Sequence, residues 1–87
     1  MNKVLKTIFI FLLNKKYIGG RHTQEKRLIK SKIKWLERTE SSEFKKEYKK
    51  AINEKLLLRT KKRTGKGSDW HISLNPRRLK EVYEMIE

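Results

Sequence analysis

Cysteine is absent from this chain of 87 residues, and proline occurs only once. Without cysteine there is no disulfide, no thiolate metal ligand and no catalytic thiol, so stability depends on an apolar core. Acidic residues are also scarce: 10 Asp and Glu stand against 24 Lys and Arg, a formal net charge of +14. This imbalance predicts an anionic partner. DNA or RNA is the leading class, and an acidic membrane surface or an acidic protein would also satisfy the charge.

The length predicts one domain over residues 1–87, because so short a chain cannot enclose two cores. Its longest apolar run, residues 7–13, follows two lysines, as in a targeting segment. The run is far shorter than the roughly 20 residues that cross a bilayer, and no small-residue cleavage site follows it. We therefore predict a buried helix over residues 3–16 and no membrane partner. A strand is the alternative, since many of these residues are β-branched or aromatic.

Two further helices are predicted after the glycine pair at 19–20. One covers residues 24–38, with Thr23 as its N-cap, and the other covers residues 43–55, after a connector at 39–42 that ends in a capping serine. The expected core faces are, in order, Leu28, Ile29, Ile33 and Leu36, and Phe44, Tyr48, Ala51 and Ile52. Lysines recur at helical spacing outside these faces, so each helix would bury one side and present a cationic one.

A basic hairpin is predicted next. Residues 56–63 change from apolar to cationic, and residues 70–74 alternate apolar and polar side chains, as in a half-buried strand. Gly65 and Gly67 permit the turn between them. Asn75 as N-cap and Pro76 at the first helical position then predict a last helix. Its expected inward residues are Leu79, Val82, Tyr83 and Ile86.

The order of three helices, a two-stranded hairpin and a fourth helix resembles the winged helix-turn-helix family, most closely between Phe44 and Leu79. The expected fold is thus mainly α with a small β-hairpin. Segments 19–23 and 73–76 also resemble those of small archaeal proteins. The family often has a glycine before the first hairpin strand, where this chain has Asn53-Glu54-Lys55.

The resemblance implies that the third helix enters the major groove of DNA and that the hairpin tip contacts a flanking backbone or minor groove. Lysine is poorer than arginine at bidentate base recognition, so phosphate contacts should outweigh base readout. We expect nucleic-acid binding by Lys45, Lys46, Lys49, Lys50 and Asn53 on the third helix, by Arg59, Lys61, Lys62, Arg63 and Lys66 on the hairpin, and by Lys26, Lys30 and Lys34 on the second helix.

Double-stranded DNA is the expected partner of a cytoplasmic, nucleoid-associated protein. Structured RNA and an acidic protein partner stay open as alternatives. The apolar first helix also suggests a homodimer, because its side chains cannot all face one small core.

No catalytic residue, cofactor or metal is expected. His22 and His71 are the only histidines and lack a second ligand motif. The glycine-containing loop at 64–68 lacks the spacing of a phosphate loop, and no helix follows it. Trp70 could stack on an unpaired base, but we expect it to pack in the core with Ile72 and Leu74.

Overall fold

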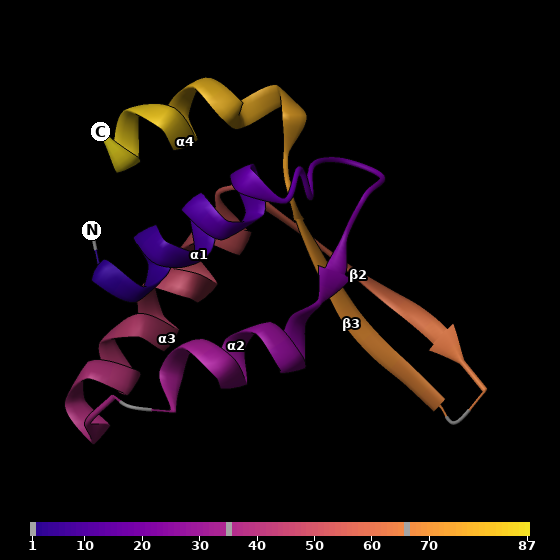
Figure 1. Cartoon of the computed structure of the whole chain (residues 1–87), viewed down its shortest axis with the longest axis horizontal. Coiled ribbons are helices and arrows are strands. Elements are labelled where there is room, and N and C mark those ends of the chain that lie inside the picture. Colours follow the sequence, from indigo (N-terminus) through magenta and orange to yellow (C-terminus); the bar gives the residue numbers. More distant parts are fainter. Residues whose placement is uncertain (1, 35, 66) are drawn as a thin grey trace.

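The computed structural model describes residues 2–34, 36–65 and 67–87. This part of the chain folds into helices and a small antiparallel sheet (Figure 1). The elements, in chain order, are α1 (Lys3–Asn14), β1 (Thr23–Gln24), α2 (Glu25–Ile33), α3 (Arg38–Asn53), β2 (Leu57–Thr64), β3 (Gly67–Leu74), the short 3-10 helix η1 (Pro76–Arg78) and α4 (Leu79–Ile86). The expectation of a mainly α chain with a small β-hairpin is confirmed.

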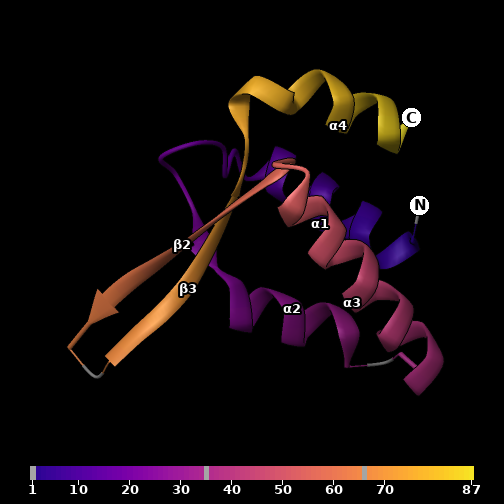
Figure 2. The same ribbon diagram turned by 180° about the vertical axis from the view of Figure 1, so that it is seen from behind.

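The predicted first helix is present as α1. Asn2 caps it, because its side-chain oxygen accepts hydrogen bonds from the backbone N–H groups of Val4 (2.8 Å) and Leu5 (3.3 Å). The helix ends at Asn14, shortly before Lys16 takes a left-handed backbone conformation. α1 lies centrally, with α4 on one side of it and α2 on the other (Figures 1 and 2).

The boundary between the second and third helices differs from the prediction. α2 ends at Ile33 instead of residue 38, and α3 begins at Arg38, so residues 39–42 lie inside a helix and form no connector. No capping serine is used: Glu37 is the N-cap of α3, and its carbonyl accepts from the N–H of Ser41 at 2.9 Å. The polar residues at 39–42 include no glycine or proline, so nothing in the backbone opposes the helix there.

Thr23 does not cap α2, because it belongs to a strand that the sequence pattern did not reveal. Thr23 and Gln24 pair with Ile72 and His71 of β3, which places β3 between β1 and β2 in the sheet. A two-residue strand is too short to show any periodicity. The strand joins the hairpin to the helices at the start of α2.

The hairpin is longer than predicted. β2 and β3 pair continuously from Leu57 with Leu74 to Thr64 with Gly67. Leu57 and Leu74 are buried at the base, whereas the far end projects beyond the helices (Figures 1 and 2). Trp70 lies on this projecting part and is 40% exposed, so its predicted place in the core is wrong.

The core lies between α1, α2, α3, α4 and the base of the hairpin, and α2 contributes the buried Leu28 as predicted. Its fully buried large side chains are Phe9, Phe44, Ile8, Leu12, Leu57, Ile72, Leu74 and Val82. Tyr83, predicted to point inward, is 50% exposed, while Leu79 and Ile86 pack against the core in part. Burial of these side chains is the main favourable term in the stability of a chain without disulfides.

The apolar run of α1 is largely accommodated by this core. Ile8, Phe9 and Leu12 are buried, and Phe11 and Leu13 pack against the core in part, which leaves Ile10 as the exposed large side chain of the run. The premise for a dimer through this helix is therefore weakened, and dimerisation stays a prediction. None of the helices in the described ranges has the length and apolar character needed to cross a membrane.

Asn75 and Pro76 begin the last helical segment as predicted. The Asn75 side-chain oxygen accepts from the N–H of Arg77 at 3.0 Å, and its amide donates to the carbonyl of Lys55 at 2.8 Å. Lys55, in the glycine-free turn that follows α3, takes a positive φ of 63°. Asn75 thus ties the end of α3 to the start of η1.

Candidate nucleic-acid interface

The predicted cationic residues of α3 are all exposed, but they do not form one uniform face. Lys45, Lys46, Lys49 and Asn53 fall within about 100° of one another around α3, on a strip that includes the groove-lining Lys45 and is here called the basic flank. Glutamates at helical spacing form a second strip, at Glu40, Glu43, Glu47 and Glu54; Glu47 and Glu54 of this strip lie beside residues of α1 and α4, and it is here called the acidic flank. Lys50 lies between the two flanks, one turn from Lys46, and its exposed ammonium is 3.9 Å from the Glu54 carboxylate. The basic flank is therefore the strip of α3 that carries lysines and no glutamate, and binding by Lys50 stays a prediction.

The lysines of α2 lie across a groove from this flank. Lys26, Lys30 and Lys34 line one side of the groove, as the helical spacing predicted, and Lys45 of α3 lines the other. Residues far apart in the sequence are thus brought to one cationic surface. Both helices contribute to this cationic surface with side chains that lie outside the core.

The hairpin carries its cations on the projecting part. Lys61, Lys62 and Arg63 are exposed. Lys61 and Arg63 share a face of the hairpin with Trp70, because cross-strand partners point the same way. Lys62 points to the other face, together with its cross-strand partner Asp69. Lys66, also predicted to bind nucleic acid, lies outside the described residues. The hairpin cations therefore point to both faces of a two-stranded ribbon.

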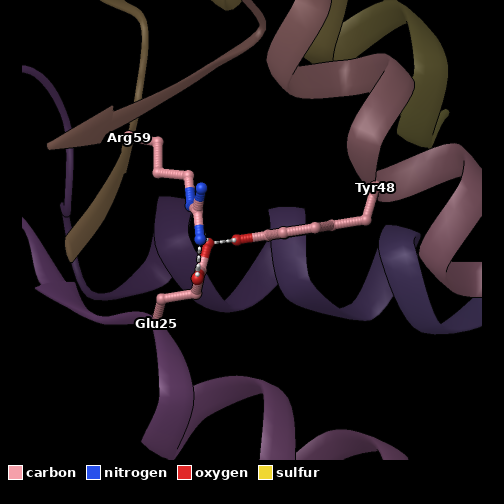
Figure 3. Close-up of polar contacts among 3 residues, drawn as sticks. All are labelled: Glu25, Tyr48 and Arg59. Carbon is pink, nitrogen blue, oxygen red and sulfur yellow. Dashed lines mark hydrogen bonds and ion pairs between the residues drawn. The ribbon is translucent and has the colours of Figure 1, made fainter. Parts of the chain in front are cut away.

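One predicted cation, Arg59, is already engaged by a carboxylate within the chain. The Arg59 guanidinium binds the Glu25 carboxylate with two hydrogen bonds, from Nε to Oε2 at 2.8 Å and from Nη2 to Oε1 at 2.9 Å. Tyr48 donates its hydroxyl to the same Oε2 at 2.7 Å. Figure 3 shows the three side chains converging from α2, α3 and β2. Here they are called the Glu25 cluster.

The Glu25 cluster is polar but partly removed from water. Burial, followed by the hydrogen bond to Glu25, raises the pKa of Tyr48 far above its usual range. The hydrogen bond to Glu25 likewise raises the pKa of Arg59. Tyr48 is thus a neutral donor and Arg59 a permanent cation at any physiological pH. The cluster fixes α2, α3 and the hairpin relative to each other by charge-assisted hydrogen bonds.

Arg59 thus holds its charge against a carboxylate, and nucleic-acid binding by this residue stays a prediction. Its guanidinium carbon also lies 4.1 Å from the centre of the Trp70 ring, within the range of a cation–π contact. The cluster was not predictable from the sequence, because Tyr48 and Arg59 are 23 and 34 residues from Glu25 and the three residues follow no motif. Only the fold brings them together.

A histidine pair is the other polar contact that the sequence did not reveal. The Nδ1 atoms of His22 and His71 lie 3.0 Å apart, with the rings at right angles. One ring must donate and the other accept, so the contact requires that at least one ring is neutral. Slight burial, with the nearby Lys62 and His71, lowers the pKa of His22. The pair lies where β1 meets β3, with no third acidic, histidine or cysteine ligand beside it in the described ranges.

The arrangement supports binding of an extended anion and offers no nucleophile with a base beside it among the side chains described above. Comparisons with family models, with curated proteins and with solved structures found no match to this chain.

Proposed function

We propose that this chain is a winged-helix protein that binds double-stranded DNA mainly through phosphate contacts. The order of α2, α3 and a projecting basic hairpin supports this fold assignment. The observation that carries the function is the grouping of exposed cations on the basic flank of α3 and on the hairpin, with the acids of α3 on the other side. Pairing within the helix cannot neutralise such a surface.

The basic flank of α3 is the proposed reading face, and the hairpin lies along a flanking backbone. Lysine is a hydrated point charge that suits phosphate better than base edges. Asn53 is exposed at the last residue of α3, and it is the side chain of this flank that could make a paired contact with adenine. The proposal is thus a binding protein with low sequence selectivity and no catalytic role.

The Glu25 cluster supports the proposal by preorganising the surface. It ties α2, α3 and β2 through one carboxylate, so the cations of these elements keep fixed separations before any ligand arrives. A surface that is already ordered loses less conformational entropy on binding. Neutralising Glu25 would therefore weaken DNA binding even though it raises the net positive charge.

The test is the salt dependence of DNA binding by the full chain, measured by fluorescence anisotropy. Each phosphate contact contributes about −0.9 to the slope of log K against log salt, so a variant with both Lys46 and Lys49 changed to Ala should flatten the slope by about 2. The matched control changes Lys3 and Lys80 to Ala, which removes the same charge from α1 and α4.

The slope of this control should stay within about 0.5 of the parent slope. If the two double variants flatten the slope equally, binding depends on net charge alone and the proposed face is wrong. The same titration is repeated with hairpin RNA, in the presence of excess random-sequence duplex. A clear preference for the RNA would indicate that the basic surface binds RNA as part of a ribonucleoprotein.

A further inference from the structure

The groove between α2, α3 and the hairpin has an apolar floor as well as a cationic rim. Ile29, Ile33 and Phe44 form the floor, and Trp70 closes the end nearest the hairpin. Its volume is about 890 Å³, which lies in the range of protein ligand sites. A surface that only bound phosphate would need the rim and would not need this floor.

The rim gives the groove a definite charge. Lys26 and Lys30 are exposed on the α2 side, and Lys45 is exposed on the α3 side. The acids that line the groove are already engaged: Glu25 with Arg59 and Tyr48, and Asp69 as acceptor from the Gln24 amide at 3.0 Å. An occupant must therefore combine apolar groups for the floor with negative charge for the rim.

Nucleic acids match only half of this description. A duplex presents phosphates on its outside and could reach the rim, but it offers no apolar group to the floor. A single strand binds by stacking bases on exposed aromatic faces. Here Phe44 is fully buried, the Tyr48 hydroxyl is held by Glu25, and Arg59 covers one face of the Trp70 ring. The floor is otherwise aliphatic, which favours contact with aliphatic or aromatic side chains.

We propose that the groove binds an acidic amphipathic helix of a partner protein. Apolar side chains at positions i, i+3 or i+4, and i+7 of that helix would enter the groove beside Ile33, and flanking Asp or Glu side chains would meet the lysine rim. The desolvated contacts at the centre supply most of the affinity, whereas the rim pairs mainly speed association. The groove shares Lys45 with the proposed DNA-binding face, whereas Lys46, Lys49 and the exposed hairpin cations Lys62 and Arg63 lie outside its lining.

The test uses the full chain and two fluorescein-labelled peptides of identical composition. The first peptide has leucines at helical spacing with glutamates between them, and the second has the same residues scrambled. Binding is measured by anisotropy at about 0.15 M salt, where long-range attraction between exposed charges is largely screened. We expect the amphipathic peptide to bind at least tenfold more tightly than the scrambled one.

Three variants locate the site. Ile33→Gln removes a floor contact without changing charge and should weaken the amphipathic peptide roughly tenfold, with duplex DNA affinity unchanged. A Lys26→Glu, Lys30→Glu double variant should also weaken the amphipathic peptide, because the two reversed charges repel its acidic side chains. A Lys3→Glu, Lys80→Glu double variant, with the same change in net charge, should have a much smaller effect.

Folding of each variant is checked by circular dichroism and thermal unfolding. Equal binding of the two peptides, or an unchanged affinity in Ile33→Gln, would overturn the proposal. The proposal would also fail if Ile33→Gln weakened the binding of a single-stranded oligonucleotide and left peptide binding unchanged. Because DNA binding is recorded for every variant, failure of the groove proposal leaves the DNA proposal standing, and the reverse also holds.

Discussion

The hydrogen bond from Tyr48 to Glu25 allows a quantitative test of the Glu25 cluster. Tyr48→Phe removes only the hydroxyl, and the carboxylate keeps both hydrogen bonds from Arg59. A hydrogen bond to a charged group contributes about 1.5–3 kcal/mol. Since Glu25 is not left without a partner, we expect the lower part of this range, about 1.5–2 kcal/mol, to be lost from the free energy of unfolding.

For a domain of this size each kcal/mol corresponds to about 4–8 °C in Tm, so Tyr48→Phe should lower Tm by about 6–16 °C. The assay is urea unfolding followed by far-UV circular dichroism, with thermal unfolding in parallel. Glu25→Ala should cost more than Tyr48→Phe, because it also breaks the Arg59 pair and leaves the Tyr48 hydroxyl without its acceptor. That extra cost should be modest, about 1 kcal/mol, because Arg59 is partly exposed.

The matched control is Tyr83→Phe. Tyr83 is half-exposed on α4, and the same loss of a hydroxyl there should change stability by no more than about 0.5 kcal/mol. If Tyr48→Phe behaves like this control, the hydroxyl contributes nothing and the cluster does not hold the three elements together. A Tyr48→Phe, Glu25→Ala double variant then measures the coupling directly, since a true contact makes the two losses less than additive.

Two further predictions concern the ends of the sheet. The lowered pKa of His22 means that the fold prefers the neutral ring, so this stabilisation is present above the ordinary value of 6.5 and is lost as pH falls through the lowered pKa. The free energy of unfolding should therefore fall between pH 7.5 and pH 5.5. Urea titrations at both pH values should show a smaller fall for His22→Asn. An equal fall would show that the histidine pair does not cause the pH dependence. Asn75→Ala should lose about 1–2 kcal/mol, because the residue both caps η1 and binds the Lys55 carbonyl; a stability equal to that of the parent in thermal unfolding would contradict this role.

Elements with strong local signals were predictable from the sequence. α1 follows from an uninterrupted apolar run, and the cap at Asn75 follows from the Asn-Pro pair. The exposure of the α3 lysines also followed from helical spacing. In each case the residues that decide the outcome are close together in the chain.

The failures share a physical cause, which is that tertiary contacts decide them. β1 exists because β3 offers it partners, and nothing within Thr23 and Gln24 predicts a strand. Trp70 shares the alternation of Ile72 but lies beyond the end of the core, and alternation gives the face of a strand without saying how far the core extends. The Glu25 cluster depends on three elements meeting, so no local pattern could have predicted it.

The separation of charge across α3 has a consequence before any contact is made. With its glutamates on one flank and Lys45, Lys46 and Lys49 on the other, α3 adds an electric dipole across its axis to the net charge of the molecule. In the field of a linear polyanion this dipole produces a torque as well as an attraction, felt within about 8 Å at physiological salt. The protein would thus be turned with its lysine side forward during approach, so that more encounters begin in a productive orientation.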